Sequence, residues 1–181
     1  MTENQVEDCI IKDPAALGYP DALIVRNARM SRSTGRVDLM ILPTTGKTRL
    51  ALVEVKRAAS YDAASKVIGQ LIMYYAAALK IGLDGLERIR QFAAMHREAA
   101  QSPNNTSLNV LAGGAPSQEV GWRLLQEGRK LKPGEIDLFL ALDGNPPPKL
   151  IDSLHLLKNH HDLTIRVAIA TGDAVRLGPA A

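Results

Sequence analysis

Two short apolar segments in the first third of the chain are each interrupted by an acidic residue. Residues 36–42 read RVDLMIL and residues 49–56 read RLALVEVK, and both are rich in the branched apolar residues typical of buried strands. The residues Thr44-Thr45-Gly46-Lys47 between them are typical of a turn. The pattern therefore predicts two strands, Arg36–Leu42 and Arg49–Lys56, that form an antiparallel hairpin.

Alternation along these strands predicts which side chains lie together. Side chains point to opposite faces in turn, so Glu54 and Lys56 share a face with the apolar residues Leu50 and Leu52. Asp38 is expected opposite them on the neighbouring strand. Ionised groups are costly to place in apolar strands unless they meet a partner or a metal ion.

Two carboxylates and one backbone carbonyl suit a hard cation that prefers oxygen ligands. The strands thus predict that Asp38, Glu54 and the carbonyl of Val55 hold Mg²⁺ or Mn²⁺, with Lys56 beside the ion. A structural ion pair between Lys56 and one of the carboxylates is the alternative. The strand pattern alone does not decide between a metal site and an ion pair.

Helices are predicted on both sides of this hairpin. Residues 2–12 begin with a capping box made by Thr2 and Gln5 and end before Asp13-Pro14. Glu7 lies in this helix one turn from apolar residues, where it could lean over the sheet edge, although a plain surface glutamate is the commoner interpretation.

A second helix is predicted from Ser60 to Leu79. It carries an apolar stripe beside a polar line spaced four residues apart, formed by Lys66, Gln70 and Tyr74. A solvent-exposed face is the plain alternative for the polar line, and an edge of the core is the alternative for Tyr74.

The remainder of the chain alternates between helical and strand patterns. Helices are expected at residues 83–101, 118–131 and 149–159, and strands at residues 108–111, 135–142 and 163–170, with a frayed tail from Gly172. Such alternation favours parallel strands joined to the first hairpin. We therefore expect a single α/β domain over residues 1–181, with a mixed central sheet flanked by helices.

The order of these parts resembles the PD-(D/E)XK nuclease superfamily. The segments VEDCIIKDPAAL, GRVDLMIL, VEVK and GQLIMYY are most similar to the branch that contains mismatch and branched-DNA endonuclease domains. The resemblance covers roughly residues 3–80 and implies a restriction-endonuclease-like fold. Val37 stands where the family motif has proline, a residue that the superfamily often lacks.

The resemblance also implies roles for five residues. In that family the aspartate and the acid of the E-x-K element hold a divalent metal, which places these roles on Asp38 and Glu54. The lysine, here Lys56, assists the attacking water. The helix glutamate and the helix glutamine, here Glu7 and Gln70, complete the catalytic site.

Charge points to a nucleic-acid partner. The chain has a net charge of +3 and a pI near 9.1, and its bases concentrate between residues 24 and 66. Such a cluster suits a phosphate backbone. The low aromatic content of 4% argues against stacking on single-stranded bases. The residues predicted to contact DNA are Arg26, Arg29, Arg32, Arg36, Arg57, Lys66 and Tyr74.

The remaining composition excludes several classes of protein. The single cysteine, Cys9, excludes an internal disulfide and is expected in the core, and the four histidines lack the spacing of a zinc site. No signal peptide and no apolar run of membrane-spanning length are present, so a cytoplasmic location is expected.

The function that these patterns favour is hydrolysis of DNA phosphodiester bonds by a Mg²⁺- or Mn²⁺-dependent endonuclease or exonuclease. A role in repair or defence follows only by family analogy. The alternative is a module of the same fold that binds nucleic acid or a partner without cutting. No recognition element is evident, and a homodimer or a targeting partner protein could supply specificity.

Overall fold

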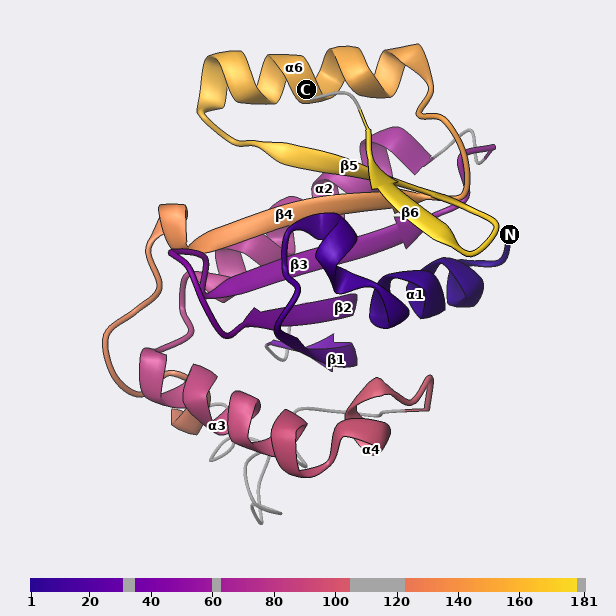
Figure 1. Ribbon diagram of the computed structural model, residues 1–181. Helices are drawn as coiled ribbons and strands as arrows, with labels where there is room; N and C mark the ends of the chain where they lie inside the picture. Colours follow the sequence, from indigo (N-terminus) through magenta and orange to yellow (C-terminus); the bar gives the residue numbers. More distant parts are fainter. Residues whose placement is uncertain (31–34, 60–62, 105–122, 179–181) are drawn as a thin grey trace.

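A mixed sheet of six strands forms the centre of the computed structural model, which describes residues 1–30, 35–59, 63–104 and 123–178 (Figure 1). The strands lie side by side in the order in which they occur in the chain. Their bounds are β1 Ala22–Arg29, β2 Arg36–Pro43, β3 Leu50–Lys56, β4 Ile136–Leu142, β5 Ile165–Thr171 and β6 Ala174–Leu177. The pairs β3–β4 and β4–β5 are parallel, and the other three pairs are antiparallel. The expected α/β fold with a mixed sheet is therefore confirmed.

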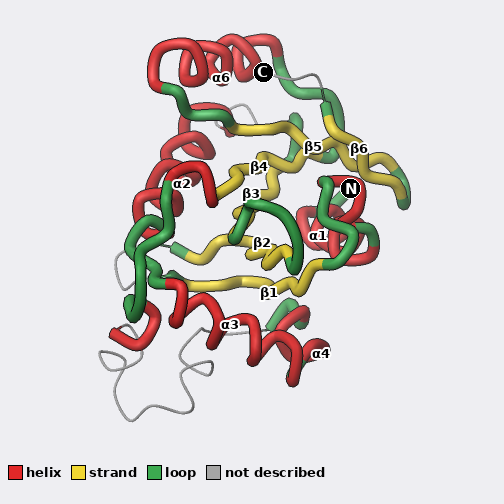
Figure 2. Tube along the Cα trace, turned by 60° about the vertical axis from the view of Figure 1, so that its left-hand side comes forward, coloured by secondary structure: helices red, strands yellow, loops and turns green. Residues whose placement is uncertain are grey.

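Helices cover both faces of this sheet. Their bounds are α1 Glu3–Lys12, α2 Ala63–Ala78, α3 Leu83–Met95, α4 Arg97–Gln101 and α6 Pro148–His161, with short 3₁₀ turns at Pro14–Leu17 and Pro133–Glu135. Figure 2 shows α1 on one side of the sheet and α2 with α6 on the other, while α3 and α4 lie along the β1 edge. Two separate apolar cores fill the spaces between the sheet and its helices.

The predicted hairpin forms, and its side chains point to the predicted faces of the sheet. β2 and β3 pair antiparallel, with Leu39 opposite Val53 and Ile41 opposite Ala51. Leu50 and Leu52 enter the core under α2, whereas Ala51 and Val53 enter the core under α1. Strict alternation along two strands that are buried on both faces accounts for this agreement.

Local signals also set the helix ends. Thr2 and Gln5 form the predicted capping box at the start of α1. In α2, Val67, Leu71 and Ala78 are buried as predicted. The helix is described from Ala63, so the expected N-cap Ser60 lies outside the described residues.

Several expectations for the second half need correction. The tail is not frayed, because residues 174–177 form β6, which pairs antiparallel with β5. The helix expected at 83–101 is divided into α3 and α4 at His96. The helix expected at 118–131 does not extend past Leu125, and Gly128 there adopts a left-handed φ of 81°. The expected strand at 108–111 lies outside the described residues.

Within the residues that the structure describes, none of the helices has the length and apolar character required to cross a membrane.

Candidate functional site

The predicted acidic residues meet where β2 and β3 part. Pairing between these strands ends at Leu39 and Val53, while β3 continues beside β4 as far as Lys56. At this point the Oδ2 atom of Asp38 accepts a hydrogen bond of 2.7 Å from the backbone N–H of Val55. A carboxylate therefore satisfies an amide of β3 just beyond the last residue pair of the hairpin.

Glu54 is the most deeply buried member of this group. Its side chain is 2% exposed. Its Oε1 atom accepts a hydrogen bond from Lys56, while its Oε2 atom is buried without a hydrogen-bond partner. Burial raises the pKa of Glu54 to about 7, and the neighbouring charge of Asp38 adds to the shift. Burial also raises the pKa of Asp38, against the lowering effects of the Val55 amide and Lys56. Two carboxylates in poorly solvated surroundings thus resist carrying negative charge together.

Lys56 lies against the oxygens that the sequence assigns to a cation. Its Nζ atom is 2.8 Å from Glu54 Oε1, 2.8 Å from the carbonyl oxygen of Val55 and 3.8 Å from Glu3 Oε1. Burial lowers the pKa of Lys56, but the hydrogen bond and charge of Glu54, with Asp38 and Glu3, raise it overall. The ion pair considered as an alternative is therefore present, and Lys56 remains protonated within it.

Helix α2 brings Gln70 and Tyr74 to the same place. The Tyr74 hydroxyl donates a hydrogen bond of 2.7 Å to the carbonyl of Arg36, two residues before Asp38. Burial raises the pKa of Tyr74, and the charges of Glu54 and Asp38 add to it. The Oε1 atom of Gln70 is buried without a partner. Gln70 lies beside the Tyr74 hydroxyl, and its part in a catalytic site stays a prediction.

Tyr74 does not lie on a surface open to DNA, because its side chain is only 2% exposed. It follows Val67 and Leu71 on the apolar stripe of α2, at the spacing that faces the sheet. The expected DNA contact of Tyr74 is therefore corrected to a core position whose hydroxyl holds the start of β2.

Arg26 also needs correction, because its guanidinium is buried against α1. Its Nε atom donates to the Glu7 carboxylate, Nη1 to Asp8 at 2.9 Å and Nη2 to the carbonyl of Asn4 at 3.1 Å. These contacts occupy Arg26 inside the fold rather than at a phosphate. A guanidinium buried between a strand and a helix needs acidic partners, and α1 supplies them.

The carboxylate of Glu7 is consequently engaged by Arg26. Its side chain is buried and pairs with Arg26. Burial raises the pKa of Glu7, the pairing with Arg26 opposes this shift, and the charge of Asp38 adds to it. Glu7 is therefore close enough to Asp38 for their charges to interact. Its carboxylate, however, forms an ion pair with Arg26.

The other predicted DNA-contacting bases divide by exposure. Arg36, Arg57 and Lys66 are exposed, and Arg29 is half-buried with an unpartnered Nε atom. Arg57 has one weak ion pair, at 3.9 Å from Asp143. Arg32 lies outside the described residues. Three exposed bases therefore remain on the elements that carry the site.

Two residues near the site were missed by the sequence analysis. Glu3 stands in the first turn of α1, one turn before Glu7 and on the same helix face. Asp143 follows β4 directly, and its Oδ1 atom accepts from the Ala58 amide at 2.6 Å, which lowers the pKa of Asp143. The signal available for Asp143 was its place after a parallel strand, because the carboxyl ends of such strands share one edge.

The oxygen atoms gathered here fit the ligands of a hard cation. The buried atoms that lack partners here, Glu54 Oε2 and Gln70 Oε1, are both acceptor oxygens, and Asp38 adds a carboxylate. Acceptors left without donors are costly, and a cation would satisfy them. No three acidic, histidine or cysteine side chains converge among the described residues, so water or substrate oxygens would complete the shell, as Mg²⁺ permits.

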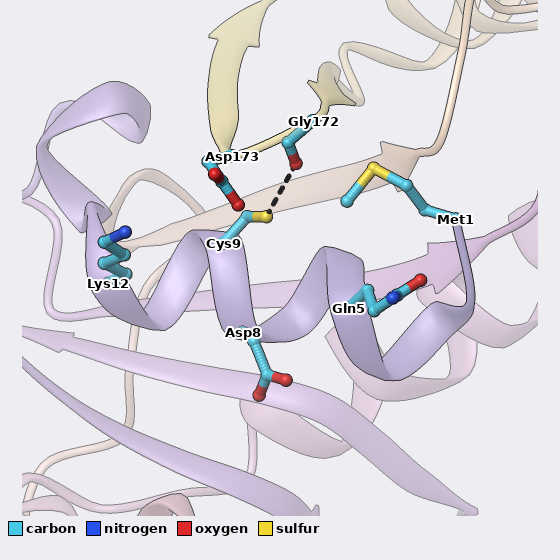
Figure 3. Close-up of a pocket in the computed structure, with 7 residues that line it drawn as sticks. All are labelled: Met1, Gln5, Asp8, Cys9, Lys12, Gly172 and Asp173. Atoms are coloured by element: carbon cyan, nitrogen blue, oxygen red, sulfur yellow. Dashed lines mark hydrogen bonds between the residues drawn. The ribbon is translucent and has the colours of Figure 1, made fainter.

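A separate pocket on the other side of α1 lacks these features. Figure 3 shows it between α1 and the turn of β5 and β6, where the Cys9 Sγ atom donates to the Gly172 carbonyl at 3.4 Å. Burial raises the pKa of Cys9, and the charges of Asp173 and Asp8 add to it. Cys9 is therefore a buried thiol rather than an activated nucleophile, in line with its expected place in the core.

The chain matches no protein-family model, no curated protein and no solved structure. Its function must therefore be inferred from the side chains that meet between the start of β2 and the end of β3.

Proposed function

We propose that this chain is a metal-dependent nuclease of the PD-(D/E)XK type, with a restriction-endonuclease-like arrangement, that hydrolyses phosphodiester bonds in DNA. The observation that carries the proposal is the meeting of Asp38, Glu54 and Lys56 where β2 and β3 part, with a buried Glu54 oxygen that has no partner. A sheet in which an antiparallel hairpin leads into parallel strands supports the same assignment.

Asp38, Glu54 and the carbonyl of Val55 would hold Mg²⁺ or Mn²⁺. When bound, such an ion acts as a Lewis acid on the phosphate and lowers the pKa of water. Gln70 presents a buried amide oxygen from α2 next to Tyr74, which itself is close to Glu54 and Asp38, and this oxygen would accept a hydrogen bond from water.

Lys56 acts in this proposal as a positively charged group beside the phosphate. As an ammonium ion, Lys56 would stabilise negative charge that develops on the phosphate rather than accept a proton. Water adds to phosphorus as the bond to the leaving 3′ oxygen breaks; the proton released by the water passes to solvent, and the 3′ oxygen takes a proton from solvent, which leaves a 5′-phosphate and a 3′-hydroxyl. The 2.8 Å contact between Lys56 and Glu54 orients the ammonium.

Substrate binding would rely on the exposed bases beside the site. Arg36 begins β2, Arg57 follows β3 and Lys66 lies in the first half of α2, so all three exposed bases are carried by the elements that form the site. Charges placed in this way contact phosphates without reading sequence.

The test is cleavage of end-labelled duplex, nicked and branched DNA by the wild-type protein and Asp38→Asn, in Mg²⁺, Mn²⁺ or EDTA. The proposal expects products only from the wild-type protein with a divalent ion. DNA binding without products under every condition would instead favour a module of this fold that does not cut. Equal cleavage by Asp38→Asn would assign the activity to a contaminant.

A further inference from the structure

The ammonium group of Lys56 lies where a bound cation would repel it. It donates to Glu54 Oε1 and to the carbonyl of Val55, at 2.8 Å each. A divalent ion held by Asp38, Glu54 and that same carbonyl would lie about 2.1 Å from its ligands. Two positive charges beside the same oxygens repel strongly in poorly solvated surroundings. Loading of the site therefore requires the ammonium to give up at least one of these contacts.

Glu3 offers the displaced ammonium another carboxylate. Its Oε1 atom is 3.8 Å from Lys56 Nζ, and among the described residues it is the one carboxylate besides Glu54 in ion-pair contact with that ammonium. The Glu3 side chain is 46% exposed, so it can rotate towards Lys56. The charge of Glu3 also acts on both Lys56 and Asp38, in accord with its position beside the two.

The position of Glu3 is fixed by the anchoring of α1 to β1. The buried guanidinium of Arg26 holds α1 through Glu7, Asp8 and the Asn4 carbonyl. Glu7 is the other glutamate on this face of α1, but its carboxylate is occupied by Arg26. Glu3 is thus the carboxylate that α1 presents to Lys56.

We propose that Glu3 is a positioning residue that receives the ammonium of Lys56 when a divalent cation occupies the site; this inference rests on the proposed function. Glu3 acts through Lys56 and is not a metal ligand. It lowers the free-energy cost of cation binding. When Lys56 loses its hydrogen bond to the Val55 carbonyl, it gains an ion pair with Glu3 instead of being left without a replacement partner.

A double-mutant cycle tests this role. Mn²⁺ affinity is measured by titration calorimetry for the wild-type protein, Glu3→Gln, Lys56→Met and the double variant, at one pH and ionic strength. We expect Glu3→Gln to weaken Mn²⁺ binding roughly three- to tenfold, Lys56→Met to strengthen it, and Glu3→Gln to have no effect when Lys56 is already replaced. Asp13→Asn, which removes an exposed carboxylate from the far end of α1, should bind Mn²⁺ as the wild-type protein does.

Each other result overturns the proposal in a distinct way. An equal decrease in affinity from Glu3→Gln in both backgrounds would mean that Glu3 acts directly on the ion. An unchanged affinity in Glu3→Gln would remove Glu3 from the site while leaving the proposed nuclease intact. Absence of Mn²⁺ binding by folded protein in every variant would overturn the metal site and this inference together. Thermal melts in EDTA establish that each variant is folded.

Discussion

The carboxylate of Asp38 accepts the backbone amide of Val55 at 2.7 Å, at the point where the pairing of β2 with β3 ends. One side chain thus has two tasks: it satisfies a strand amide, and it places a negative charge beside Glu54. Substitutions that separate the hydrogen bond from the charge can distinguish these tasks.

Asp38→Asn should keep the fold and lose the metal. Asparagine retains an oxygen that accepts the Val55 N–H, and it removes a charge that raises the pKa of Glu54. We expect a melting temperature equal to or above that of the wild-type protein at pH 8, without the rise that Mn²⁺ produces in the wild-type protein. Asp38→Ala leaves the amide unpartnered and should cost about 1–3 kcal/mol. A Mn²⁺-induced rise retained by Asp38→Asn would exclude Asp38 as a ligand.

The buried pair of Arg26 and Glu7 should affect stability rather than metal binding. Glu7→Leu leaves the guanidinium without its most buried partner, so we expect a destabilisation of about 3 kcal/mol in urea unfolding. Arg26→Met added to Glu7→Leu should recover much of this stability. Asp8→Asn is the control, because its carboxylate on the same guanidinium is 65% exposed and should contribute little. Mn²⁺ affinity should be unchanged in folded Glu7→Leu, and a weaker affinity would restore Glu7 to the site.

The sequence predicted part of the strand arrangement and of the candidate site. The hairpin of β2 and β3 and the shared face of Glu54 with Leu52 followed from strand alternation, which is strict where both faces are buried. Strand β6 was missed because it is four residues long and mostly exposed, so it has no apolar pattern.

The partners of buried polar side chains could not be read from the chain. Arg26 and Tyr74 were both assigned to DNA because they are polar, yet both lie in the interior. Which acid neutralises Arg26 depends on how α1 crosses β1, and this packing has no local signal. The periodic spacing of Tyr74 with Val67 and Leu71 could have indicated its burial, since residues at that spacing share a helix face.

The pH dependence of stability should reveal the buried Glu54. Its pKa is raised from 4.5 to about 7, so between these values the folded protein binds more protons than the unfolded chain. Stability should therefore be highest below that range, fall as the pH rises through it, and level off above about pH 7. The measurement is urea unfolding from pH 5 to pH 8 in EDTA, and Glu54→Gln is expected to remove this part of the fall. Saturating Mn²⁺ should also reduce it, because the ion stabilises the ionised carboxylate. A wild-type profile identical to that of Glu54→Gln would contradict the raised pKa.

DNA binding should depend on salt through the three exposed bases of the site. Removing a base that neutralises one phosphate should reduce the slope of log K against log salt by about 0.9 on duplex DNA. Arg57→Ala, Arg36→Ala and Lys66→Ala should each show this change in fluorescence anisotropy, with no preference for one sequence. Lys47→Ala, an exposed base in the turn at the other end of the hairpin, should retain the wild-type slope. Equal slopes in all four variants would place the DNA elsewhere on the protein.

Lys56→Met should separate binding from cleavage. The ammonium faces Glu54 and the Val55 carbonyl, so its removal relieves a competing charge and leaves the proposed metal ligands in place. The variant should fold, bind Mn²⁺ and bind DNA, yet cleave about two to four orders of magnitude more slowly, because charge that develops on the phosphate loses its stabilising partner. Lys56→Arg should not recover the rate, since the planar guanidinium is larger and cannot take the position of a compact ammonium. Single-turnover cleavage with saturating protein measures the step directly, and a rate near that of the wild-type protein would leave Lys56 as a structural ion-pair partner of Glu54.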